Sequence, residues 1–278
     1  MTKSRILVNS LPKSGTHLLA QAVELFGYRE HFAETEDSRR ATPIFFNYRE
    51  ARDALALEPA SPLAEDRVNI GSLASCPVPL PVFRRWLDAL PEGRYILGHV
   101  LFTPALPPLL AELNYRHVFI IRDPRAVVMS LMAFILDTGH MPRRHFLEAD
   151  LKALPEARRL DFILNGGLAP EAGVNILPFA EAYRAVWAWR EAMGCLFLRY
   201  EDLVGAAGGG SDAAQRQAME RLAEHLGAPP PENLAIYNPN SRTFRSGTVD
   251  GWRRHLDEAG LARLETALAP LCRELGYD

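Results

Sequence analysis

The sequence predicts an α/β fold with a central parallel sheet flanked by helices. Four short segments are rich in Ile, Leu, Val and Phe, as strands buried on both faces are: "RILVN" (5–9), "RYILGHV" (94–100), "HVFIIRD" (117–123) and "CLFLRY" (195–200). Segments of helical length separate them, and this alternation is typical of parallel sheets with helical crossovers. The 278 residues, 48% of them hydrophobic, suffice for one core, so we expect a single domain over residues 1–278.

The spacing of apolar residues predicts the helices. Residues 16–26 repeat apolar side chains three and four positions apart, and 260–276 places five leucines on one stripe. Such stripes are typical of amphipathic helices that pack on a sheet. The run "GAAGGGSD" (205–212) is expected to form a turn before a helix that starts near Ser211.

Two segments fit the alternation poorly. Residues 58–82 contain five prolines, and 139–176 carry "MPRRH" and "NGG". Long loops in compact domains are often functional, so we expect 139–176 to be a helical lid insertion over an acceptor site. Its basic run, "MPRRH" (141–145), would attract an acidic group, and Gly166 and Gly167 would form the hinge. The apolar residues of this segment could equally pack on the body as ordinary helices.

Composition argues against several classes of function. The 31 basic and 34 acidic residues give a net charge of -3, so no broad basic face for nucleic acid is expected. No apolar stretch approaches the ~20 residues that span a bilayer, and the first ten residues lack the pattern of a secretion signal. The expectation is a cytoplasmic protein. Three distant cysteines and eight histidines without paired spacing do not indicate a metal site.

The first stretch with chemical character is "LVNSLPKSGTHLL" (7–19). It predicts a buried strand, then a turn containing Gly15, then a helix that starts near Thr16. The first N–H groups of such a helix have no partners within the helix. Such groups bind phosphate or sulfate, Lys13 adds a positive charge, and Ser14 and Thr16 add hydroxyl donors. Lys13 precedes the glycine, whereas the common nucleotide-binding loop has its lysine after it. The alternative is an ordinary turn with a solvated lysine and a threonine cap.

Two further stretches suit a phosphate. In "IIRDPRAVVMS" (120–130), Arg122 ends a buried strand at the sheet edge where ligands of α/β proteins bind, and Ser130 follows two turns into a helix. Arg122 and Asp123 could instead form a surface ion pair. The segment "TFRSGTVDGWRRHL" (243–256) combines arginines and glycines, as phosphate-wrapping loops do, with Trp252 as an anchor. A surface turn with scattered arginines is the alternative.

These motifs resemble a known family. "PKSGTHLL", "RDPRAVVMS" and "FRSGTVDGWRRHL" resemble, in that order, the three cofactor-binding segments of the sulfotransferases that use 3′-phosphoadenosine 5′-phosphosulfate (PAPS). "LRYEDLV" (198–204) is similar to a further family segment, and the four together span nearly the whole chain. The chain looks closest to soluble bacterial members. The resemblance implies a P-loop-like sulfotransferase fold that binds PAPS and releases adenosine 3′,5′-bisphosphate, without a metal.

The resemblance also implies roles for the matching positions. The 5′-phosphosulfate would be held by the turn and the start of the helix, namely by Lys13, Ser14, Gly15 and Thr16, with His17 beside them. The 3′-phosphate would be held by Arg122 and Ser130, joined by Arg245, Ser246 and Gly247. Tyr200 would approach the adenine.

The chain departs from the family pattern at two of these places. It has Asp250 and Gly251 where the family commonly has a Gly-x-Trp ending, so this turn is expected to be reshaped. Ser246 stands where many members carry lysine, which weakens one phosphate contact. Neither change removes the arginines.

Sulfuryl transfer needs an in-line approach, positive charge on the leaving oxygen and a base for the acceptor proton. Lys13 suits the second requirement. His99 ends a predicted strand on the same sheet edge and titrates near neutral pH, so it is the first candidate for the base. Many family members have Lys-x-His here, and this chain has Leu97 at the lysine position. His99 could instead be a buried structural histidine, and Glu34 is the rival base.

Two other functions stay open at this point. A kinase that uses ATP is the nearest enzyme alternative, although its lysine after the loop glycine and its Mg²⁺-binding carboxylate are not evident. The other is a nucleotide-sensing binding protein without catalysis. The acceptor, whether small or carrier-bound, and the oligomeric state are not identified by the sequence.

Overall fold

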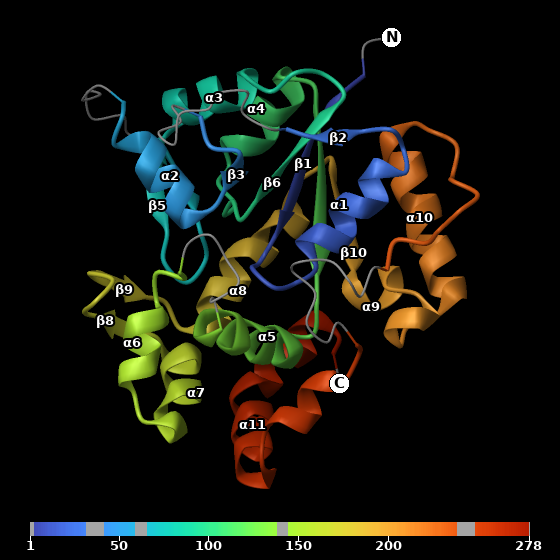
Figure 1. Ribbon diagram of the computed structural model, residues 1–278. Helices are drawn as coiled ribbons and strands as arrows, with labels where there is room; N and C mark the ends of the chain where they lie inside the picture. Colours follow the sequence, from blue (N-terminus) through green and yellow to red (C-terminus); the bar gives the residue numbers. More distant parts are fainter. Residues whose placement is uncertain (1–2, 32–41, 59–65, 138–143, 238–247, 278) are drawn as a thin grey trace.

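The computed structural model describes residues 3–31, 42–58, 66–137, 144–237 and 248–277. Its main sheet has the strand order β10-β7-β1-β6-β2, with β3 also paired to β6, and every pairing in it is parallel (Figure 1). The strands of this sheet are β1 (Arg5–Ser10), β2 (Arg29–Glu30), β3 (Phe45–Phe46), β6 (Arg94–Gly98), β7 (Tyr115–Ile121) and β10 (Cys195–Arg199). The predicted α/β fold and the four predicted strands are confirmed.

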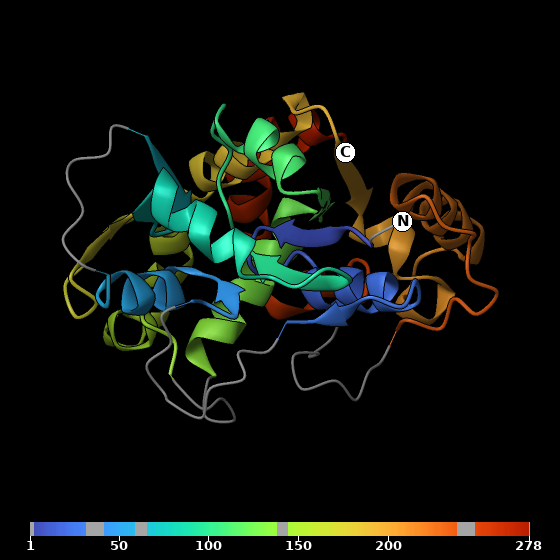
Figure 2. The ribbon, with the colours of Figure 1, turned by 90° about the horizontal axis from the view of Figure 1, so that it is seen from above.

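Helices cover both faces of the sheet, because the strands alternate apolar side chains between two cores. In β1, Leu7 belongs to one hydrophobic cluster, and its neighbours Ile6 and Val8 belong to the other. One face packs on α1 (Thr16–Glu24), α9 (Tyr200–Leu203) and α10 (Asp212–Leu226). The other packs on α3 (Leu80–Asp88), α4 (Leu106–Glu112), α5 (Pro124–Leu136), α8 (Phe179–Trp187) and α11 (Glu258–Leu275). Figure 2 shows α1 and α4 on opposite sides of the sheet.

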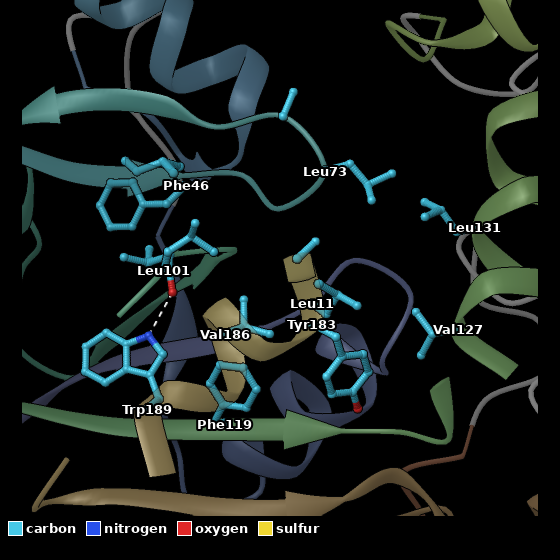
Figure 3. Close-up of a cluster of buried hydrophobic side chains, with 14 of the residues drawn as sticks. Leu11, Phe46, Leu73, Leu101, Phe119, Val127, Leu131, Tyr183, Val186 and Trp189 are labelled. Atoms are coloured by element: carbon cyan, nitrogen blue, oxygen red, sulfur yellow. Dashed lines mark hydrogen bonds between the residues drawn. The ribbon is translucent and has the colours of Figure 1, made fainter. Parts of the chain in front are cut away.

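The larger core is built around aromatic residues. Phe119 of β7 and Val186 of α8 are fully buried there. Figure 3 shows both beside Trp189, a residue of the short helix η1 (Ala188–Glu191). The indole Nε1 of Trp189 donates to the carbonyl oxygen of Val100 at 2.8 Å. This bond ties the helical layer to the segment that follows β6, because a buried carbonyl needs a donor.

The C-terminal helices begin and end as their sequences predict. The Ser211 side chain accepts from the backbone N–H at the start of α10, and Gly227 ends this helix with φ 66°. The helix predicted at 260–276 is α11, which Asp257 caps and Gly276 ends with φ 70°. Glycine is favoured at such ends because the left-handed backbone costs it nothing.

The two segments expected as long loops contain regular structure. Residues 66–82 form the hairpin of β4 (Arg67–Ile70) and β5 (Cys76–Pro79) and the start of α3. Residues 144–176 form α6 (Glu148–Ala153), α7 (Glu156–Asn165) and the hairpin of β8 (Gly167–Ala169) and β9 (Val174–Ile176). Leu151 and Ile163 are fully buried in the main core. The alternative reading of ordinary packed helices therefore holds for the described part, and a lid movement stays a prediction.

His145 packs on aromatic residues in the structure, and its expected role in attracting an acidic group stays a prediction. Its Nδ1 accepts the N–H of Leu147 at 3.2 Å, and its ring packs on Phe134 and Phe146. Burial, followed by the nearby Arg49 charge, lowers the pKa of His145 to about 3, so the imidazole is neutral at pH 7. Arg144 is exposed, and Arg143 lies outside the described residues.

The chain connections change face between β1 and β7. These strands are neighbours in the sheet. The chain leaves β1 through α1 on one face and leaves β7 through α5 on the other. In open α/β sheets, ligands bind where successive connections diverge in this way. The two motifs around Lys13 and Arg122 follow these two strands.

Candidate active site

The turn after β1 has a backbone that only special residues adopt. Lys13 has φ 70° and Gly15 has φ 104°, and the N–H of Ser14 donates to the Leu11 carbonyl at 3.2 Å. A Cβ on Gly15 would stand 2.6 Å from Cδ2 of Tyr200. Gly15 is therefore required both by its dihedral angle and by the ring beside it. A lysine held at positive φ is strained, and such strain concentrates at functional sites.

The start of α1 has the properties of an anion site. Its N-cap is Gly15, which offers no side chain, and its first turn contains no acidic residue. The Ser14 hydroxyl oxygen is fully buried and has no hydrogen-bond partner among the described residues. A buried hydroxyl without a partner costs about 1–3 kcal/mol, so this group points to a ligand that completes its hydrogen bonding. Unpaired N–H groups and the helix dipole favour an anionic one.

The other side chains of the turn differ in what they contact. The Lys13 ammonium lies 4.4 Å from the centroid of the Phe134 ring, so the lysine side chain is directed towards α5, the helix that follows β7. The Thr16 hydroxyl is buried and bonds to the Ser10 hydroxyl at 2.6 Å. Thr16 thus holds the turn to β1, a role that the sequence did not predict. The side chain of His17 is exposed.

His99 follows β6 and is bonded directly to the end of β1. Its Nδ1 lies 2.8 Å from the Ser10 carbonyl oxygen, which can only accept, so Nδ1 carries the proton and Nε2 keeps its lone pair. Burial is the main cause that lowers the pKa of His99 to about 4, and the charges of His17 and Lys13 contribute. The imidazole is therefore neutral at pH 7, as a proton acceptor must be.

Asn9 fixes this junction and was missed from the sequence. Its side-chain oxygen accepts the N–H groups of Ser10 and Val100, at 3.0 and 2.9 Å, and its amide donates to the Val100 carbonyl at 3.0 Å. Asn9 therefore pairs both backbone groups of the residue after His99. A fully buried polar residue near the end of an apolar strand was the signal in the sequence.

Arg122 lies directly beyond β7 and is 8% exposed. Its guanidinium carbon is 4.1 Å from the centroid of the Tyr200 ring, the same ring that faces Gly15. The turn, Tyr200 and Arg122 are thereby brought together. Ser130 is half-buried on α5, and no contact between it and Arg122 is recorded among the described residues.

The alternative of an ion pair between Arg122 and Asp123 is wrong. The Asp123 carboxylate instead accepts three side-chain contacts from Arg125, whose Nη2 lies 2.8 Å away, and caps α5 through the backbone N–H of Arg125. Among the described residues, no carboxylate lies within ion-pair distance of Arg122. A buried guanidinium without such a partner favours an anionic ligand.

The C-terminal motif is described from Thr248 onward. Glu34, Arg245, Ser246 and Gly247 lie outside the described residues. The departure at Asp250 gives a left-handed residue with φ 60°, which starts the short helix η3 (Gly251–His255). Trp252 is buried there between the guanidinium groups of Arg125 and Arg253, at 5.1 and 4.4 Å. It anchors the motif, as expected.

A cavity of about 260 Å³ opens beside Arg122. Its walls bring the end of β7 together with the C-terminal motif, and they include Arg122, Asp123, Glu201, Asp250, Arg253 and Tyr277. Glu201 and Tyr277 were not predicted, although Glu201 directly follows Tyr200 in the "LRYEDLV" segment. Within the described ranges, no group of three His, Cys, Asp or Glu could hold a metal ion. No helix there is long and apolar enough to cross a membrane.

We predict that Gly15→Ala lowers the free energy of unfolding in urea by more than Gly194→Ala does. Both glycines have positive φ, 104° and 84°, but only at Gly15 would the new Cβ meet another atom within 4 Å. Each variant should lose about 1–2 kcal/mol from the left-handed backbone, and Gly15→Ala should lose more through its contact with Tyr200. Equal losses would show that the Tyr200 ring does not constrain the turn.

A known structure shares this fold. The chain is similar to mouse sulfotransferase SULT7A1 complexed with PAP, with a TM-score of 0.55 and 16% identity over 98% of this chain and 84% of that chain. Retinol dehydratase in complex with androsterone and the inactive cofactor PAP gives a TM-score of 0.46 and 17% identity over 98% and 81% of the two chains. No curated protein matches the sequence.

The family comparison covers nearly the entire sequence. The matching family is described as the sulfotransferase domain, and the match spans residues 3–276. This favours sulfuryl transfer over the kinase and the binding protein without catalysis. The chain belongs to the sulfotransferase family and is a sulfotransferase.

Proposed function

We propose that the protein transfers a sulfuryl group from PAPS to a hydroxyl or amine of an acceptor, either a small molecule or a carrier-bound group. The observation that carries the proposal is the buried Ser14 hydroxyl, which lacks a described partner at the start of α1. A phosphate or sulfate oxygen at this point would complete its hydrogen bonding. Lys13, on the same turn, would supply the counter-charge.

The residues present fit both ends of the donor. The N–H groups of the turn, with Ser14, would hold the 5′-phosphosulfate at the end of β1. Arg122 would hold the 3′-phosphate at the end of the neighbouring β7, with Ser130 and the segment of Arg245, Ser246 and Gly247. Tyr200, which lies between Gly15 and Arg122, supports a nucleotide that bridges the two strand ends.

Two residues would serve the transfer itself. When bound, PAPS would supply an activated sulfuryl group whose leaving oxygen gains negative charge during transfer. Lys13 would stabilise that charge, which grows towards the transition state. The lone pair on Nε2 of His99 would take the proton of the acceptor hydroxyl or amine, while Nδ1 stays bonded to Ser10.

The acceptor side is proposed to lie next to the aromatic residues near Lys13. The Lys13 ammonium contacts Phe134, whose ring meets His145, and His145 stacks on Phe146. These rings belong to α5 and to the segment 139–176, proposed as the acceptor-binding insertion. Apolar or aromatic acceptors suit such walls better than charged ones, because the described rings offer few hydrogen bonds.

We predict that Arg122→Ala selectively removes recognition of the 3′-phosphate. Binding of adenosine 3′,5′-bisphosphate should weaken about 30- to 150-fold, since charge-assisted hydrogen bonds are worth about 2–3 kcal/mol, and binding of AMP should change less than about threefold. Calorimetric titration with both ligands, and with ADP and ATP, measures this.

The control for this titration is Arg116→Ala, an exposed arginine of the same strand. It should leave both affinities unchanged. Equal weakening of the bisphosphate and AMP in Arg122→Ala would refute the assignment. Tighter binding of ATP than of the bisphosphate by the unmodified protein would refute PAPS as the donor.

We predict that His99→Gln lowers turnover about 100- to 10,000-fold, the usual loss on removing a general base, while bisphosphate binding is retained. Glu34→Gln should do much less. In the unmodified enzyme, kcat/KM should fall as pH drops towards about 4, because protonated His99 cannot accept a proton. The acid limb of kcat should lie at higher pH, since bound anions raise the pKa of His99. A normal rate in His99→Gln with collapse in Glu34→Gln would reverse the assignment.

A further inference from the structure

The backbone of Arg122 lies where the sheet can no longer pair it. β7 is in register with β1 as far as Ile120 and with β10 as far as Ile121. Arg122 is the next residue and is buried. Its peptide N–H and carbonyl oxygen therefore need partners from outside the sheet, because buried backbone groups are nearly always paired.

A single hydroxyl meets both needs. The Tyr183 hydroxyl donates to the Arg122 carbonyl oxygen at 2.6 Å and accepts the Arg122 N–H at 3.2 Å. Burial raises the pKa of Tyr183, so the phenol keeps the proton that it donates. The ring is fully buried on α8 and packs edge to face on Phe179. Figure 3 shows it near Val127, with the hydroxyl turned towards the end of β7.

The next residue and the side chain are held as well. The Asp123 N–H donates to one carboxylate oxygen of Glu201 at 3.0 Å, and the Tyr277 hydroxyl donates to the other at 2.9 Å. The Arg122 guanidinium rests over the ring of Tyr200, which precedes Glu201. The backbone of Arg122 and Asp123 and the Arg122 guanidinium are therefore held in place by protein contacts, without a nucleotide.

We propose that Tyr183 is a positioning residue that sets the preference of the enzyme for a 3′-phosphorylated nucleotide. It holds the Arg122 peptide so that the guanidinium stands ready at the cavity before the ligand arrives. The inference rests on the proposed function, in which Arg122 receives the 3′-phosphate. Pre-organisation of this kind raises affinity because less ordering remains to be done on binding. The Tyr183 contact should therefore raise the affinity for ligands that carry a 3′-phosphate and leave the affinity for other nucleotides unchanged.

The test is Tyr183→Phe, which removes the hydroxyl and keeps the ring. Binding of adenosine 3′,5′-bisphosphate should weaken about five- to tenfold, the loss typical of one hydrogen-bonding group, with less than twofold change for AMP. Turnover at saturating donor should stay within about twofold of the unmodified enzyme. Weakening of both ligands by the same factor would overturn the proposal.

The matched control is Tyr115→Phe. Tyr115 is a buried tyrosine at the other end of β7, and its hydroxyl donates to the Leu87 carbonyl oxygen at 2.6 Å. The variant loses a comparable buried hydrogen bond and should lower the melting temperature without changing the ratio of the two affinities. A changed ratio in Tyr115→Phe would mean that general loosening, and not Tyr183, sets the preference.

A double-mutant cycle tests the positioning role of Tyr183 separately from the proposed phosphate-binding role of Arg122. In an Arg122→Ala background, Tyr183→Phe should have no further effect on bisphosphate binding. If Arg122→Ala is selective and Tyr183→Phe is not, the positioning role fails and the phosphate role of Arg122 stands. If Arg122→Ala weakens bisphosphate and AMP equally, the phosphate-binding role of Arg122 is refuted, and the positioning role of Tyr183 is refuted with it.

Hydrogen exchange in the unmodified protein gives a second test, independent of how the variants fold. The Arg122 amide should exchange slowly in the free protein and change little when the bisphosphate binds. Protection that develops only on binding would show that Arg122 is not positioned in advance.

Discussion

The active site depends on how the buried parallel strands end. The inner strands β1 and β7 are paired with a strand on each side, but this pairing stops while the chain is still inside the protein. The polar groups beyond that point must be paired by other means. At the end of β1, the Ser10 carbonyl bonds to the His99 imidazole, and at the end of β7, the Tyr183 hydroxyl pairs with the Arg122 peptide. The contacts that satisfy the strand ends therefore orient the proposed catalytic and binding side chains.

The same arrangement brings positive charge together. Lys13, the start of α1 and Arg122 lie at two adjacent strand ends. The carboxylate of Asp123 is held by Arg125, and that of Glu201 accepts bonds from the Asp123 N–H and the Tyr277 hydroxyl. A charge in a poorly solvated site acts more strongly than one in water. The charge on Lys13 also helps keep His99 unprotonated, so one lysine would serve both the leaving group and the base. A bound polyanion would offset that effect and raise the pKa of His99, which would make it a stronger base in the complex.

Local patterns in the sequence predicted the main strands of the sheet well. The main strands appear within two residues of their predicted limits, because a run buried on both faces has a composition that little else shares. The prolines of 58–82 obscured the hairpin of β4 and β5, since β5 has a single partner strand and tolerates proline. The Tyr183 bond and the burial of His145 were not predictable, because both depend on packing between segments distant in the chain.

A crystal structure with adenosine 3′,5′-bisphosphate bound would test the central claim most directly. The account predicts the 5′-phosphate at the turn of residues 13–16, within hydrogen-bond distance of the Ser14 hydroxyl. It predicts the 3′-phosphate on the guanidinium of Arg122 and His99 Nε2 open towards the acceptor side. A bisphosphate bound in the reverse direction, or one that leaves the Ser14 hydroxyl without a partner, would contradict it.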